Sequence, residues 1–183
     1  QRAGRGRRPQ AGFTLIELMV TVAIIGILAV VGVPAMAGMI NVNRINTATD
    51  NMIASLQLAR PEAIRRGARV TVCASNDGQT CASSTDWNRW IVIGSDNVAS
   101  EGGSEVIDVI RDETTTGGIQ LQGPADGIVF RSSGVTDGEE TLVVCLPTSY
   151  PAANQRELTV VLSGGHRTEK ASGSGTAPSM NVP

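Results

Sequence analysis

A single carboxylate stands at the start of a long apolar stretch, and its position could support ion-pair chemistry. Glu17 is the only charged residue between Phe13 and Ile40. Cleavage of the chain after Gly12 would give Phe13 a free amine four positions before Glu17. In an assembly, the carboxylate of one subunit would neutralise the amine of a neighbour, and breaking such a buried pair is costly. The alternative is a Glu17 that is solvated at the edge of the apolar stretch, where its charge costs little.

Three cysteines and one histidine are the other side chains with reactive potential. Cys73 and Cys81 would close a short loop that contains the turn-forming pair Asp77-Gly78, and an oxidising compartment would permit this disulfide. We favour this pairing. Pairing of Cys145 with Cys73 or with Cys81 is the alternative, and one cysteine is always left over. His166 is the lone histidine, so the spacing does not indicate a zinc site. We therefore expect no metal, no cofactor and no enzymatic activity.

The apolar stretch itself covers residues 13–40 and follows a basic segment. Residues 1–12 contain four arginines and no acidic residue, whereas the 20 residues from 18 to 37 carry no charge. As a helix those residues would span roughly 30 Å, the thickness of the hydrocarbon core of a bilayer. A basic flank before such a stretch predicts one membrane-spanning helix with its N-terminus in the cytoplasm. A secretory signal peptide, with a shorter apolar region, and a buried core helix are the alternatives.

The residues around this boundary carry a recognisable motif. Residues 12–20, Gly-Phe-Thr-Leu-Ile-Glu-Leu-Met-Val, resemble the class III signal of type IV prepilins and type II secretion pseudopilins. The resemblance implies that residues 1–12 are a leader, that a prepilin peptidase cleaves between Gly12 and Phe13, and that the new Phe13 amine is N-methylated. It also implies that Glu17 is the glutamate used in filament assembly.

A second, amphipathic segment of the same helix is predicted at residues 41–68. Apolar side chains recur there at steps of three and four, which forms one helical face, and Gly67 is a natural stop. Pro34 removes a backbone hydrogen bond within the apolar stretch. Its placement resembles the helix-breaking proline of pilins, and a static kink is the alternative. Pro61 could split off a short last turn. The apolar positions are Ile45, Ala48, Met52, Ile53, Leu56, Ala59, Ala63 and Ile64.

From residue 69 the apolar periodicity changes from that of a helix to that of a strand. Six strands are expected, at residues 69–73, 90–93, 105–111, 128–131, 141–146 and 157–162, with Asp-Gly turns between several of them. The prediction is an α+β fold of the pilin kind, in which a long N-terminal helix packs on an antiparallel β head at residues 69–170. Residues 171–183 are small and polar, and we expect a disordered tail.

The predicted β head also resembles a known family, in the segments around its Cys and Trp residues. The segments around Cys73, Cys81, Trp87, Trp90 and Cys145 are similar to those of FimT/FimU-type minor pilins, which share a head fold with the GspH pseudopilin of type II secretion. The spacing of the Cys and Trp residues favours the pilus branch. The resemblance covers residues 12–167.

These observations predict a minor pilin of a bacterial type IV pilus that acts in filament assembly or priming, and hence in twitching or adhesion. Its partners would be other major and minor pilins or pseudopilins, the prepilin peptidase and inner-membrane lipid. We expect the head in the periplasm and the subunit later in a pilus or pseudopilus. A GspH-like pseudopilin of a type II secretion system is the alternative function.

DNA binding during natural transformation is a second alternative, because some FimT-type minor pilins bind DNA through a Gly-Arg-x-Arg motif near the C-terminus. Here Arg167 and Lys170 would be the contacts, but His166 and Thr168 stand where the two arginines should be, and Glu169 lies between the cations. The formal net charge of the whole chain is −2, which excludes a strongly basic nucleic-acid binder.

Overall fold

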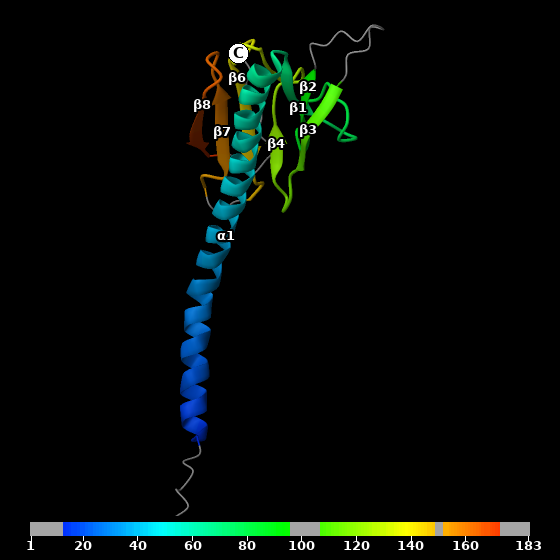
Figure 1. The fold of residues 1–183 in the computed structure, drawn as a ribbon. Helices are drawn as coiled ribbons and strands as arrows, with labels where there is room; N and C mark the ends of the chain where they lie inside the picture. The colour runs from blue at the N-terminus through cyan, green and yellow to red at the C-terminus, as the bar shows by residue number, and fades with distance from the viewer. Residues whose placement is uncertain (1–12, 96–106, 149–151, 173–183) are drawn as a thin grey trace, which may run out of the picture. The chain divides into compact units, whose positions relative to one another are not determined.

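The computed structural model describes residues 13–95, 107–148 and 152–172 (Figure 1). They belong to two compact units, residues 1–38 and residues 39–183. The predicted leader lies outside the described residues, as does most of the predicted tail. Only residues 171 and 172 of that tail are described, and Ala171 is the last residue of a strand.

One helix, α1 (Leu15–Arg66), opens the described chain. Gly67 ends it with a φ of 60°, a left-handed conformation that glycine adopts without steric cost. The Gly67 amide donates to the carbonyl of Ile64, and the Ala68 amide donates to that of Ala63. This pair of bonds satisfies the last carbonyls of the helix, as in a Schellman motif. The predicted stop is therefore confirmed, and Pro61 lies inside α1 without separating a last turn.

The first unit contributes residues 15–38 of α1. Among the residues that the structure describes, no helix has both the length and the apolar character needed to cross a membrane. The predicted membrane-spanning segment stays a prediction.

Within the described residues of the second unit, eight strands form two antiparallel sheets. One sheet has the order β3-β2-β1-β5 and the other β4-β6-β7-β8. The antiparallel head is therefore present, but β4 and β8 were not among the six predicted strands. The strands are β1 (Val70–Ala74), β2 (Arg89–Ser95), β3 (Ile107–Thr114), β4 (Gln120–Gln122), β5 (Ile128–Phe130), β6 (Glu140–Cys145), β7 (Gln155–Val160) and β8 (His166–Ala171).

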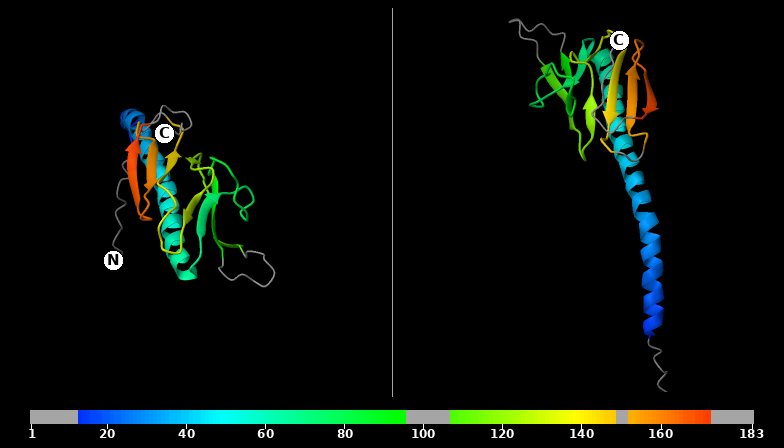
Figure 2. Two further views of the ribbon diagram at one scale, coloured as in Figure 1. Left: turned by 90° about the horizontal axis from the view of Figure 1, so that it is seen from above. Right: turned by 180° about the vertical axis from the view of Figure 1, so that it is seen from behind.

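The head is built around the segment of α1 that belongs to this unit. Figures 1 and 2 show β7 and β8 on one side of α1 and β2 and β3 on the other. The helix contributes one buried face to a core that both sheets share, and both tryptophans are fully buried in it. Burial of this apolar surface is the main stabilising term of the head. The buried helix residues of this core are Ile45, Met52, Leu56, Ala59 and Ala63.

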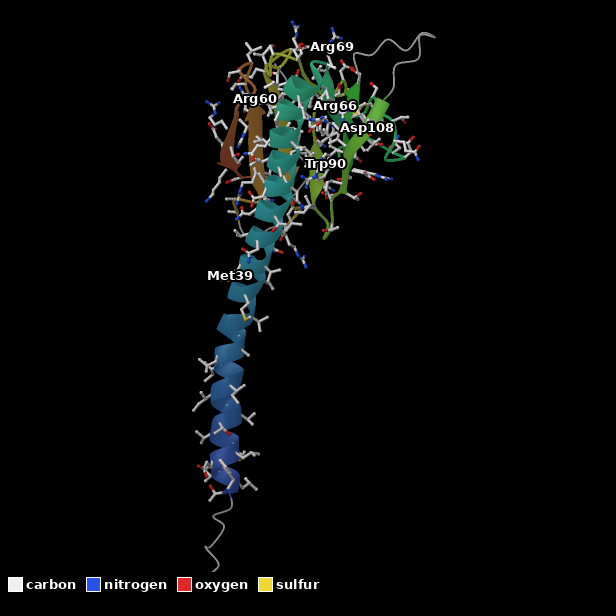
Figure 3. All side chains as sticks on the ribbon, in the orientation of Figure 1. Met39, Arg60, Arg66, Arg69, Trp90 and Asp108 are labelled. Atoms are coloured by element: carbon white, nitrogen blue, oxygen red, sulfur yellow. A yellow bond between two sulfur atoms is a disulfide. The ribbon has the colours of Figure 1, made fainter. Side chains whose placement is uncertain are left out.

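Side-chain hydrogen bonds link α1 to both sheets. The indole nitrogen of Trp90 in β2 donates to Ser55 Oγ at 3.0 Å, and both residues are buried. Arg66 Nη2 donates to Asp108 Oδ2 of β3 at 2.7 Å (Figure 3). On the other sheet, Arg156 Nη2 of β7 donates to Asn46 Oδ1 at 3.1 Å. Since hydrogen bonds are directional, these contacts set the position of the helix along its own axis.

Candidate functional site

The beginning of α1 is a capped helix terminus. The Thr14 hydroxyl oxygen accepts a hydrogen bond from the Glu17 amide at 3.3 Å, and the Thr14 carbonyl accepts one from the Leu18 amide at 3.2 Å. Thr14 is therefore the N-cap, and Glu17 occupies the third helical position, the spacing of a capping box. A carboxylate in the first turn also interacts favourably with the helix dipole. Glu17 thus has a role in its own helix that we did not predict, although the Thr-x-x-Glu pattern is visible in the sequence.

Phe13 and Glu17 are both exposed, and among the described residues no cation pairs with Glu17. Gly12 lies outside the described residues, so the cleavage of the Gly12–Phe13 bond stays a prediction. The Glu17 carboxylate is thus left accessible, at a fixed position in the first turn, to a cation from another molecule.

Large apolar side chains before and after Glu17 in the first unit are exposed in the isolated chain. Monomeric soluble proteins rarely expose a contiguous apolar surface of this kind, so another molecule is expected to cover it. Residue 34 is helical within α1, and the predicted role of Pro34 as a helix break stays a prediction. The large exposed apolar residues are Leu15, Ile16, Leu18, Met19, Val20, Val22, Ile24, Ile25, Ile27, Leu28, Val30, Val33 and Met36.

The head contains one disulfide, between Cys73 and Cys81, so the favoured pairing is confirmed. Asp77 organises the loop between them. It accepts hydrogen bonds from the amides of Thr80 and Gln79, both at 2.8 Å, and from the hydroxyls of Thr80 and Ser75. These bonds, led by the one from the Thr80 amide, hold the pKa of Asp77 well below its ordinary value. The loop is therefore a structural feature of the head, closed covalently and ordered by one carboxylate.

Cys145 is the remaining cysteine, and it is free and buried at the end of β6. Gln155 Nε2 lies 3.6 Å from its sulfur, and burial raises the pKa of the thiol. A protonated, buried thiol is a poor nucleophile. The two alternative pairings, Cys73–Cys145 and Cys81–Cys145, are absent from the structure.

We predict that Cys145 in the native protein resists a thiol-alkylating reagent. Unfolding without a reductant should expose one reactive thiol per chain, and reduction should expose three, which intact-mass spectrometry would count. Fast alkylation of the native protein at Cys145 would contradict the burial of this side chain.

The two candidate DNA contacts lie on β8, an edge strand. Successive side chains of a strand point to opposite faces, and Arg167 and Lys170 are three positions apart, so they occupy opposite faces of the sheet. On β7, Arg167 is paired with Thr159 and Lys170 with Arg156, and these two partners are also three positions apart. Arg167 also pairs with Glu169 at 3.2 Å. The structure therefore does not bring these two cations together. Across the described residues, no group of three or more His, Cys, Asp or Glu side chains could hold a metal ion.

Comparison with known proteins gives two family matches. The model of a family described as type II transport protein GspH matches residues 48–165, more than half of the chain. The model of the prokaryotic N-terminal methylation motif matches residues 7–33, which contain Gly12, Phe13 and Glu17. None of the curated proteins compared with the chain matches it.

Solved structures include similar folds. A crystal structure of the type IV minor pilin FimU from Pseudomonas aeruginosa is 19% identical, covers 69% of this chain and 89% of its own, and has a TM-score of 0.50. The minor pseudopilin EpsH from the type 2 secretion system of Vibrio cholerae is 20% identical. The match covers 69% of this chain and 97% of the EpsH chain, with a TM-score of 0.48. The likeness to the first of these shows that the chain shares its fold.

Proposed function

The chain belongs to the GspH family of minor pilins and pseudopilins, and from this premise we propose that it is a minor pilin that takes part in the assembly or priming of a type IV pilus. One observation carries the proposal. An exposed apolar helix starts at a capped turn that presents the Glu17 carboxylate, directly after the predicted processing site. Neighbouring subunits could bury this surface together, and the spacing of Cys and Trp in the head favours the pilus branch.

Processing would create a positive charge that can pair with the Glu17 carboxylate of a neighbouring subunit. Cleavage after Gly12 leaves a cationic, methylated amine on Phe13, immediately before the N-cap Thr14. A positive charge there is unfavourable in its own subunit, because the helix N-terminus already carries a partial positive charge. The amine is better placed against the carboxylate of a neighbour, and Glu17 is the carboxylate that we propose for this pair. The pair would fix the axial offset between adjacent helices.

We propose that the subunit first resides in the inner membrane, with its head in the periplasm, and then enters the filament. The methylation motif implies processing by a prepilin peptidase, and family membership implies assembly with other pilins or pseudopilins. The disulfide Cys73–Cys81 suits an oxidising compartment. Nucleic-acid binding is left out of the proposal, because Arg167 and Lys170 lie on opposite faces of β8 and Arg167 is paired with Glu169.

Mass spectrometry of sheared surface filaments and of washed membranes tests this proposal. We expect a peptide that begins at N-methylated Phe13 in the filament fraction. Its presence in the membrane fraction alone would contradict the pilus assignment and favour the type II secretion pseudopilin. Recovery of an uncleaved Gly12–Phe13 bond alone would contradict the processing step itself.

A further inference from the structure

A groove of about 420 Å³ runs along the head between α1 and the β7–β8 hairpin. Leu56, Gln57 and Arg60 line it from the helix. Val160 and His166 line it from the hairpin. Leu56 and Val160 are buried and form an apolar floor, whereas Arg60 and His166 are exposed and form a polar rim. Figure 3 shows Arg60 on the side of α1 that faces β7 and β8, away from Arg66 and Asp108.

Gly164, which lines this groove, and Gly134, which lies directly beside it, both have left-handed conformations. Gly134 has a φ of 79° and Gly164 a φ of 75°. A Cβ atom added to Gly164 would lie 2.4 Å from the carbonyl oxygen of Gly134 and 3.2 Å from Arg60 Nε. A Cβ atom added to Gly134 would lie 3.4 Å from the same Nε. The two loops are thus in close contact, and the Arg60 side chain passes over both, which gives the groove a preformed end.

An exposed apolar patch, formed by Ile64, Val135 and Leu162, adjoins this end. The patch residues are 52%, 38% and 57% exposed. Ile64 Cδ1 lies 2.8 Å from the Cβ position of Gly134, and the Thr136 amide donates to the Leu162 carbonyl at 3.0 Å, so the three lie around the same two loops. Within the described residues from 41 onward, Val109 is the other large apolar side chain of comparable exposure. Exposed apolar residues that gather in this way mark an interaction surface.

The rim of the groove is basic on an otherwise acidic protein. Over the ranges that the structure describes, no carboxylate pairs with Arg60. The chain has 15 Lys and Arg residues and 17 Asp and Glu residues. Cleavage after Gly12 would remove four arginines and leave 11 basic residues against the 17 acidic ones. The Arg60 guanidinium, without a carboxylate partner in the described part of the chain and beside buried apolar side chains, favours a planar carboxylate as its ligand. The two groups form strong bidentate hydrogen bonds.

We propose that this groove and the patch receive an acidic segment of the adjacent pilin-like subunit in the filament. One carboxylate of that segment pairs with Arg60, and an apolar side chain beside it packs on Ile64 and Leu162. The inference rests on the proposed function, because it requires a filament neighbour. Contacts in an open helical assembly are heterologous, so this surface need not complement itself.

Site-specific photocrosslinking in the full-length protein tests the proposal. A benzophenone amino acid replaces Leu162 in cells that assemble filaments, and mass spectrometry identifies the crosslinked protein. We expect a subunit that carries the same N-terminal processing motif. Arg60→Glu should lower the crosslink yield about tenfold through charge repulsion, whereas Arg60→Lys should keep most of it. The same photoreactive residue in place of Val109 is the control, and its crosslinks should not respond to Arg60→Glu.

The outcomes separate this inference from the proposed function. Filaments that contain methylated Phe13 but give no crosslink from position 162 would overturn the inference and leave the function intact. A crosslink whose yield is unchanged by Arg60→Glu would also overturn it. So would a crosslink to lipid, to DNA or to a protein without the processing motif. Absence of the methylated peptide from filaments would instead refute the proposed function.

Discussion

Glu17→Gln is expected to leave the precursor processed at Phe13 but to exclude it from filaments. Glutamine supports a capping box as well as glutamate does, so the first turn of α1 should persist. What the variant loses is the negative charge that would face a neighbour's amine. Breaking a buried ion pair by removing one partner costs about 3–5 kcal/mol, so we expect incorporation to fall about a hundredfold or more. Immunoblots of sheared filaments against whole-cell levels would measure it.

Thr14→Ala is the matched control for this variant. It removes the hydroxyl that accepts from the Glu17 amide and leaves the carboxylate in place. Loss of an N-cap costs about 1 kcal/mol, which a long helix can tolerate, so incorporation should stay close to normal. Normal incorporation of Glu17→Gln would refute the charge pair. Equal defects in both variants would show that the capped turn, and not the charge, is what assembly requires.

Gly164→Ala is expected to lower the free energy of unfolding of the head by about 3 kcal/mol. Alanine is strained in the left-handed conformation that Gly164 adopts. In addition, the added Cβ would lie 2.4 Å from the Gly134 carbonyl oxygen, and relieving this clash would require a shift of the backbone. Urea unfolding of the full-length protein in detergent, followed by the fluorescence of the buried Trp87 and Trp90, would measure the change.

Gly165→Ala provides the comparison at the next position. Its added Cβ would meet its nearest neighbour, Val161 Cγ2, at 3.5 Å, an ordinary van der Waals contact. The substitution should therefore change stability by less than about 1 kcal/mol. Similar losses in the two variants would show that the hairpin is sensitive to any side chain there and that the contact between the two loops is not the cause.

The sequence predicted the features that depend on local pattern. Gly67 ends the helix because its lack of a side chain suits the left-handed turn, and this is readable without tertiary information. The strands β1, β2 and β6 carry apolar residues that a sheet must bury, and they were found to within a few residues. The α+β architecture follows from the change of periodicity at residue 69 and from the need to cover the apolar face of the helix.

The missed features depend on partners that are distant in sequence. The strand β8 consists of exposed, mostly polar residues and exists because it pairs with β7, and β4 is three residues long and is held by β6. Arg156 is 5% exposed and bonds Asn46, which is 110 positions earlier in the chain. No local pattern predicts a buried arginine. The separation of Arg167 from Lys170 could have been foreseen only if their segment had first been identified as a strand.

The anchoring of α1 on both sheets has a mechanical consequence. Ser55 and Arg66 bond to β2 and β3, whereas Asn46 bonds to β7. These hydrogen bonds reach sideways from the helix to the strands, so tension along the helix axis at residue 39 would load them in shear and at the same time. Contacts loaded in parallel share the force and must fail together, whereas contacts loaded in series break in succession. A head attached in this way is expected to hold its helix under load until these hydrogen bonds and the shared core break together.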